Sequence, residues 1–166
     1  MDEAIGANLE SSSGPDPAIP VPEGLLHSDI TQIILGGFYD VYNQLGSGFL
    51  ESVYEAALAI DLEGAELGVA RQAEINVFFR GHCVGKFISD LIVADNVVVE
   101  LKAVRSITPA HEAQLINLLK ATRIEVGLIL NFGPKPEFRR LVYSNSNKPF
   151  HLVGKPTYRQ KQPAPD

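Results

Sequence analysis

Three ionisable residues interrupt two strongly apolar stretches of the sequence. Asp90 precedes a Leu-Ile-Val run, and Glu100 and Lys102 end the run that begins at Val97. Buried charges are costly unless they are paired or bind a metal ion. Two carboxylates suit a hard divalent cation such as Mg²⁺ or Mn²⁺, and a nearby lysine can orient a water or stabilise charge on an attacked phosphate. These residue types therefore indicate metal-assisted phosphoester chemistry.

The three side chains can act together in only one strand register. A three-residue hairpin loop at residues 94–96 pairs Val93 with Val97 and places Asp90 opposite Glu100. Side chains alternate along a strand, so Glu100 and Lys102 then share one face with Asp90. A two-residue loop would move Asp90 to the opposite face. The alternative is an ordinary E-x-K triplet on an edge strand, with Glu100 and Lys102 in a surface salt bridge.

The elements that must position these residues are predicted in the order ααβββαββ. Apolar residues at helical spacing indicate the helices, and alternating or continuous apolar runs indicate the strands. The helices are expected at residues 29–43, from residue 49 to a glycine at 64 or 68, and from Thr108 onward with Pro109 at its first position. The strands are expected from residue 69 to a turn at Gly81-His82, and at 84–93, 97–104, 126–131 and 140–143, the last at a sheet edge. This pattern predicts an α/β fold with a mixed central sheet flanked by helices.

Composition divides the 166-residue chain into three parts. Residues 1–24 hold five acids and no base, are rich in serine and proline, and are predicted to be a disordered arm. Residues 25–144 form the predicted domain, and residues 145–166, with four bases and one acid, a flexible basic tail. The net charge of −6 counts against a protein that coats nucleic acid by charge alone, but a carboxylate-based metal site is compatible with it.

Cysteine content and hydropathy indicate the compartment. Cys83 is the one cysteine of the sequence, so no internal disulfide can form, which suits a reducing environment. The sequence shows no secretory signal pattern and no apolar run long enough to span a bilayer. We therefore expect a cytoplasmic protein without membrane contact.

A string of the form G-x-x-E-x-x-Y occupies residues 48–54, with Gly48, Glu51 and Tyr54 at its defined positions. The string resembles the signature of the GxxExxY protein family, a branch of the PD-(D/E)XK nuclease superfamily, and the resemblance extends over residues 30–143. Further matching blocks, in the same order, lie at residues 45–48, 89–93, 99–103, 111–115, 118–122 and 127–133. Several blocks in one order are more specific than any single triplet.

The resemblance implies a restriction-endonuclease-like core and a Mg²⁺- or Mn²⁺-dependent nuclease site. Asp90, Glu100 and the carbonyl of Leu101 would be metal ligands, and Lys102 would be the catalytic lysine. Glu51 would complete the acidic cluster directly or through water. Ser89 stands where the family has proline, a position that contributes no ligand. Nucleic acid, DNA or RNA, would be the substrate.

Other residues have a functional and a structural interpretation. Gln114 is implied near the substrate or the lysine, and it could instead be a polar residue on a helix flank. Tyr54 lies on an apolar stripe, which makes it a core aromatic whose hydroxyl could contact substrate at the site edge. Lys120 could join a basic rim that binds the phosphate backbone, or be dispersed surface charge. Glu51 could simply stabilise a helix N-terminus.

Two further expectations concern partners. The aromatic residues Phe38, Tyr39 and Tyr42 of the first helix could form a homodimer face, although core packing is the simpler account. The alternative to an active nuclease is a non-catalytic nucleic-acid-binding or interaction module that retains the nuclease fold.

Overall fold

Two helices precede the sheet. A computed structural model describes residues 25–148 and 158–160, in which α1 is Ser28–Leu45 and α2 is Glu51–Gly64. Both predicted helices are confirmed, with α1 extending one residue earlier and two residues later than expected. The turn between them contains Gly46 and Gly48, whose φ angles of 66° and 112° favour glycine. These glycines let the chain reverse and bring α2 back alongside α1.

The described strands form a six-stranded sheet in the order β5-β4-β3-β2-β1-β6. The strands are β1 Val69–Phe79, β2 His82–Val93, β3 Val97–Lys102, β4 Val126–Asn131, β5 Glu137–Val142 and β6 Tyr158–Gln160. The β3 and β4 strands are parallel, and every other neighbouring pair is antiparallel. The crossover between β3 and β4 carries α3, Pro109–Lys120. The predicted mixed α/β fold is confirmed.

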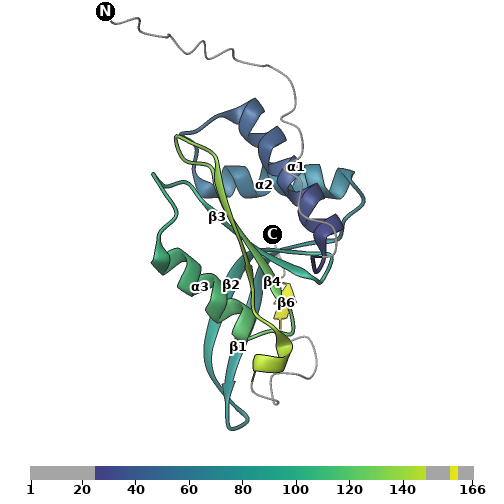
Figure 1. Ribbon diagram of the computed structural model, residues 1–166, viewed down its shortest axis with the longest axis vertical. Coiled ribbons are helices and arrows are strands. Elements are labelled where there is room, and N and C mark those ends of the chain that lie inside the picture. The colour runs from purple at the N-terminus through teal and green to yellow at the C-terminus, as the bar shows by residue number, and fades with distance from the viewer. Residues whose placement is uncertain (1–24, 149–157, 161–166) are drawn as a thin grey trace, which may run out of the picture.

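Helices cover both faces of the sheet (Figure 1). On the α1–α2 face, Leu91, Val93, Val97 and Val99 pack with buried residues of these helices. On the α3 face, Ile92 and Val98 pack with Leu115 and its helical neighbours. The alternation between two cores explains why residues 91–93 of β2 and residues 97–99 of β3 are continuously apolar. Asp90, Glu100 and Lys102, near the carboxyl end of β3, therefore interrupt an apolar surround.

The structure differs from the predicted elements at three places. The turn between β1 and β2 consists of Arg80 and Gly81, one residue earlier than predicted, because Phe79 pairs with His82. The β3 strand ends at Lys102 and β5 begins at Glu137, so the first is shorter and the second longer than expected.

Parts of the predicted arm and tail fall outside the described residues. All of residues 1–24 and the tail segments 149–157 and 161–166 do so. Within the described part of the tail, the strand β6 was not predicted; it pairs with β1 at residues 73–75. Among the described helices, none is both long and apolar enough to cross a membrane.

The aromatic residues of α1 pack inward. Phe38 is fully buried and contacts Phe132 edge-on at 4.8 Å between ring centroids. Tyr42 is half-buried, and its hydroxyl donates to the carbonyls of Gly133 and Pro134 at 2.9 and 3.0 Å. The simpler account, core packing, therefore explains these two aromatics without a dimer interface.

Candidate metal and catalytic site

The β2–β3 hairpin has the predicted register. Val93 pairs with Val97, Ile92 with Val98 and Leu91 with Val99. The loop is therefore the three residues 94–96, and Ala94 and Asp95 adopt φ angles of 50° and 55° within it. The prediction of an odd loop is confirmed, and the next positions along the two strands are Asp90 and Glu100.

Asp90 and Glu100 meet where the β2–β3 pairing ends. One carboxylate oxygen of Asp90 accepts a hydrogen bond from the backbone N–H of Leu101 at 2.8 Å. A carboxylate oxygen of Glu100 accepts from the backbone N–H of Asp90 at 3.4 Å. Each carboxylate thus accepts a hydrogen bond from a backbone N–H of the opposite strand. The structure brings the two predicted metal ligands together, with the Leu101 peptide between them.

Both carboxyl groups are held in an environment that disfavours their charge. Burial, and then the neighbouring Asp90 carboxylate, raise the pKa of Glu100 to about 8, although hydrogen bonds and the Lys102 charge oppose this. Burial also raises the pKa of Asp90, assisted by the charges of Glu55 and Glu51 and opposed by the Leu101 N–H. A cation between these groups would relieve both the desolvation and the repulsion.

Lys102 completes the central part of the site. Its side chain is half-buried, and its charge lowers the pKa of both Asp90 and Glu100. Within residues 25–148, however, the structure shows no ion pair within 4.0 Å for any of these three residues. The alternative of a surface salt bridge between Glu100 and Lys102 is therefore wrong, and Glu100 is buried.

Glu51 reaches the same end of β3 from the other side. It is the first residue of α2, it is exposed, and its carboxylate accepts from the backbone N–H of Ala103 at 3.4 Å. The negative charge of Glu51 contributes to the raised pKa of Asp90. Glu51 therefore lies at the positive end of a helix and near Asp90, and its part in the acidic cluster stays a prediction.

Glu55 is a neighbour of the site that sequence reasoning missed. It is buried on α2 and accepts from Arg71 Nε at 3.1 Å and from Gln72 Nε2 at 2.5 Å. Gln72 has a φ of 49°, and the β1–β2 pairing omits Gln72 and Asp90. The register is the same on both sides of this gap, so it is not a β-bulge, and the Gln72 side chain reaches Glu55 across it. The position of Glu55 one helical turn after Glu51 was the signal that could have revealed it.

We expect Glu55→Gln to destabilise the protein by about 1–3 kcal/mol, because a buried carboxylate with two charged or polar donors is replaced by an amide. Urea unfolding measures the change. The matched control is Glu74→Gln, which removes an ion pair with Lys86 at 3.1 Å between two partly exposed side chains. That change should cost less than about 1 kcal/mol. Equal losses in the two variants would contradict a special role for Glu55.

Asn131 holds the chain that follows Lys102. Asn131 is buried and lies beside Lys102 in the parallel β3–β4 pair. Its Oδ1 accepts from the backbone N–H groups of Val104 and Gly133 at 3.0 and 3.1 Å, and its Nδ2 donates to the Val104 carbonyl at 2.9 Å. The asparagine thus ties the ends of β3 and β4 together and fixes the loop next to the lysine.

Gly133 is required by this arrangement, because a Cβ at residue 133 would collide with the Val104 carbonyl oxygen. We expect Gly133→Ala to lower the free energy of unfolding by about 2–4 kcal/mol, measured by urea or thermal unfolding. Gly36→Ala is the control, since a Cβ at this α1 position meets nothing within 4 Å. That change should stabilise the protein by up to about 1 kcal/mol. A tolerated Gly133→Ala would contradict the close approach.

Three other predicted residues lie differently from the acidic pair. Gln114 is exposed on α3. Tyr54 is fully buried; its hydroxyl donates to the Gly46 carbonyl at 2.6 Å and accepts from the Phe49 N–H at 3.2 Å. Lys120 is exposed in the last turn of α3, with its Nζ 5.4 Å from the centre of the Tyr143 ring. None of the three contacts Asp90 or Glu100 through a described hydrogen bond.

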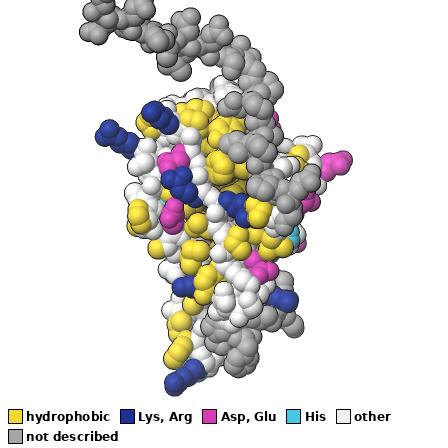
Figure 2. Space-filling model, viewed as in Figure 1, with side chains coloured by type: hydrophobic (Ala, Val, Ile, Leu, Met, Phe, Trp, Pro, Cys, Tyr) yellow, Lys and Arg dark blue, Asp and Glu magenta, His cyan; other side chains and the backbone are white. Residues whose placement is uncertain are grey.

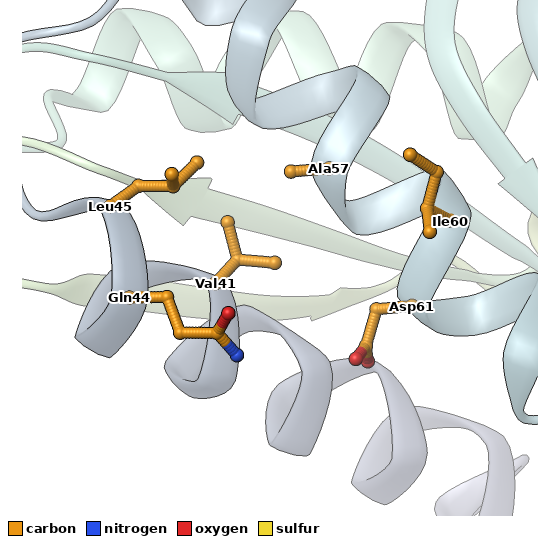
Figure 3. Close-up of a pocket in the computed structure, with 6 residues that line it drawn as sticks. All are labelled: Val41, Gln44, Leu45, Ala57, Ile60 and Asp61. Atoms are coloured by element: carbon orange, nitrogen blue, oxygen red, sulfur yellow. The ribbon is translucent and has the colours of Figure 1, made fainter.

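A shallow hollow of about 240 Å³ lies between α1 and α2 (Figure 3). Its lining is mainly aliphatic, with Asp61 as its one ionisable side chain. Burial, and then the charge of Asp40, raise the pKa of Asp61. The hollow contains none of the predicted site residues, so it belongs to the packing of the two helices and not to the acidic site.

The carboxylates of Asp90 and Glu100 determine which metal ion the site could hold. Within the described ranges, no group of three or more His, Cys, Asp or Glu side chains is arranged to hold one. Mg²⁺, however, binds through one or two carboxylates together with waters and substrate phosphate. Asp90 and Glu100 supply such a pair, and burial, the main cause of the raised pKa of both, disfavours their charged forms unless a cation is bound. The residues present therefore fit a hydrated divalent cation.

Comparison with known proteins agrees with this geometry. A family model described as PD-(D/E)XK nuclease superfamily matches residues 28–141, from the start of α1 into β5. Comparison with curated proteins and with solved structures gave no match. The match covers more than half of the chain, and the sheet and helices form the expected restriction-endonuclease-like core. The chain therefore belongs to the PD-(D/E)XK nuclease superfamily.

Proposed function

We propose that this protein is a metal-dependent nuclease that hydrolyses phosphodiester bonds in nucleic acids. The observation that carries the proposal is the hydrogen bond from the Leu101 N–H to the Asp90 carboxylate. Leu101 lies between Glu100 and Lys102 in the chain, so this bond brings Asp90 close to both residues. Membership in the superfamily supports a nuclease-type function. The positive charge that the acidic pair lacks is what a divalent cation would supply.

The residues of the chain have distinct roles in this proposal. Asp90, Glu100 and the Leu101 carbonyl would hold Mg²⁺ or Mn²⁺, with Glu51 joining through a water molecule. The metal, when bound, neutralises phosphate charge and makes a bound water easier to deprotonate. The ammonium of Lys102 would hydrogen-bond to a phosphate oxygen and stabilise the negative charge that grows as the bond breaks.

The reaction adds one water across a phosphorus–oxygen bond. The water oxygen forms a bond to phosphorus, the bond from phosphorus to the departing sugar oxygen breaks, and that oxygen leaves with a proton. Lys102 lies two residues after Glu100 on β3, near enough for its charge to lower the pKa of both acids, so it could orient the water or the phosphate. Gln114 and Lys120, exposed along α3, would contact the nucleic acid farther from the cleaved bond.

We also propose that the chain is a member of the GxxExxY family. The three defining residues have coherent places in the structure. Gly48 has the positive φ that the turn before α2 needs, Tyr54 fastens that turn through its hydroxyl, and Glu51 lies at the end of β3. Tyr54 would thus be a positioning residue for Glu51, and its buried ring leaves little surface for a substrate contact.

The test is cleavage of single- and double-stranded DNA and RNA by the full chain, with Mg²⁺, with Mn²⁺ and with EDTA. We expect cleavage of at least one substrate that requires metal and is lost in Asp90→Asn. Identical null results for wild type and variant on all substrates would remove the enzyme proposal. Salt-dependent binding without metal-dependent cleavage would indicate a non-catalytic nucleic-acid-binding module.

A further inference from the structure

The β1–β2 hairpin extends beyond the rest of the sheet. The β2 strand pairs with β3 only through residues 91–93, and β6 pairs with β1 only at residues 73–75. Among the described residues, no third strand pairs with the hairpin from Asn76 to Gly85, and it closes at a turn of Arg80 and Gly81. Figure 1 shows it projecting from the sheet below α3. We refer to residues 75–89 as the hairpin arm.

The hairpin arm exposes an unusual amount of apolar surface for a segment of its length. Phe79, Val84, Phe87 and Ile88 are each between 45 % and 62 % exposed. Two of these side chains are aromatic rings, whose faces can stack on other flat groups. Phe87 and Ile88 are consecutive on β2 and therefore point to opposite faces of the arm, so both faces carry exposed apolar surface.

The charge of the hairpin arm is opposite to that of the whole chain. Residues 75–89 contain Arg80, His82 and Lys86 and no acidic residue, whereas the chain carries a net charge of −6. Lys86 is already paired with Glu74, just before the arm, at 3.1 Å, so Arg80 is the base that the tip offers to a ligand. The guanidinium of Arg80 lies over the Phe79 ring, 5.1 Å from its centre. In Figure 2, hydrophobic and basic side chains cover the projecting lower end of the molecule, where Figure 1 places this turn. The arm thus combines aromatic and cationic groups at its tip.

The same strand leads from the tip to the candidate site. His82 begins β2, and Asp90 follows eight residues later on that strand. At about 3.3 Å per residue, the tip lies roughly 25 Å from Asp90. A polymer bound along the hairpin arm could therefore extend into the acidic site.

We propose that the hairpin arm binds a single-stranded stretch of the nucleic acid that enters the site; this inference rests on the proposed function. Unpaired bases present flat faces that stack on aromatic side chains, and the phosphates of the strand attract Arg80. Duplex DNA or RNA keeps its base faces stacked inside the helix, so it cannot use the aromatic part of this surface. The Phe79–Arg80 pair at the tip supplies both kinds of contact.

The test measures binding of labelled oligonucleotides of about 20 nucleotides by fluorescence anisotropy. The full chain carries Lys102→Met so that the oligonucleotide is not consumed, and Phe79→Ala or Arg80→Glu is added. We expect each addition to weaken single-strand binding roughly 10-fold. Arg80→Glu should also lower the slope of log affinity against log salt by about one. Both residues are exposed, so thermal unfolding should be unchanged.

Lys135→Glu is the matched control, because it makes the same kind of charge change on an exposed residue in the β4–β5 turn, on the other side of the sheet. We expect it to alter affinity less than about 3-fold. An equal effect of Lys135→Glu and Arg80→Glu would overturn the inference in favour of general electrostatics. Unchanged oligonucleotide binding by the Phe79→Ala protein would also overturn it. A third contrary result would be a dimer, seen by light scattering, that both arm variants disrupt without altering oligonucleotide affinity.

The outcomes separate this inference from the proposed function. If the wild-type protein cleaves nucleic acid but both arm variants bind like the Lys102→Met parent, only the hairpin-arm inference fails. If the parent binds single strands through the arm but wild type cleaves no substrate, the nuclease proposal fails and the arm inference stands. If the parent binds no oligonucleotide at all, the arm inference is overturned.

Discussion

Lys102→Met lowers the kcat for phosphodiester cleavage by about 100- to 1000-fold in the proposed nuclease, the loss typical when one preorganised donor to a developing negative charge is removed. Methionine has a similar length and no charge, so the half-buried position should stay filled. The Asp90–Leu101 contact uses the backbone of β3 and does not depend on the lysine side chain. The measurement is single-turnover cleavage with saturating enzyme and Mg²⁺, alongside thermal unfolding.

Lys120→Met is the control for this prediction. Lys120 is exposed in the last turn of α3, over the Tyr143 ring, and the same replacement removes the same charge. We expect a change in kcat of less than about 3-fold, with a rise in KM if Lys120 binds the phosphate backbone. A Lys102→Met protein that cleaves as fast as Lys120→Met would show that Lys102 does not act in the chemical step.

The residues that could be predicted from sequence are those whose position follows from strand periodicity. Because Val93 pairs with Val97, the alternation of residues along the two strands brings Asp90 close to Glu100. The order of elements followed similarly, because each apolar run matches one period. These features depend on local spacing, which a single sequence contains.

The features that could not be predicted depend on contacts between distant segments. Gln72 adopts a positive φ in β1, and its side chain reaches Glu55 on α2. Asn131 binds the backbone of Val104, 27 residues earlier. Nothing in the local pattern around these residues indicates their partners. Gln114 is exposed, since the buried stripe of α3 runs through Leu115, Leu118 and Leu119, and its place near the substrate stays a prediction.

The second large effect is expected from Glu100→Gln. The pKa of Glu100 is raised from an ordinary 4.5 to about 8, first by burial and then by Asp90. The folded state therefore binds a proton more tightly than the unfolded state. The stabilisation from this proton is fully present below about pH 4.5 and is lost as the pH rises through about 8. At about 1.4 kcal/mol per pKa unit, the metal-free protein should lose up to about 5 kcal/mol of unfolding free energy across this range.

Glutamine keeps the shape of the side chain but cannot ionise. Glu100→Gln should therefore unfold at a higher temperature than wild type at pH 8.5 in EDTA, and its stability should vary less between pH 5 and 8.5. With Mg²⁺ at about 100 times its dissociation constant, wild type should gain about 2.7 kcal/mol by mass action, whereas Glu100→Gln should gain little. Urea unfolding at each pH, with and without Mg²⁺, measures both effects.

Glu63→Gln is the matched control, since Glu63 is exposed on α2 and outside the acidic pair. It should leave both the pH profile and the Mg²⁺ effect as in wild type. A Glu100→Gln protein that is less stable than wild type at pH 8.5 would show that the buried carboxylate is already compensated there. An equal gain from Mg²⁺ in the Glu100→Gln protein and wild type would place the cation elsewhere. Because Glu100 is proposed as a metal ligand, Glu100→Gln should lower cleavage activity while it raises stability at pH 8.5. This combination is expected of a charge that serves metal binding and not folding.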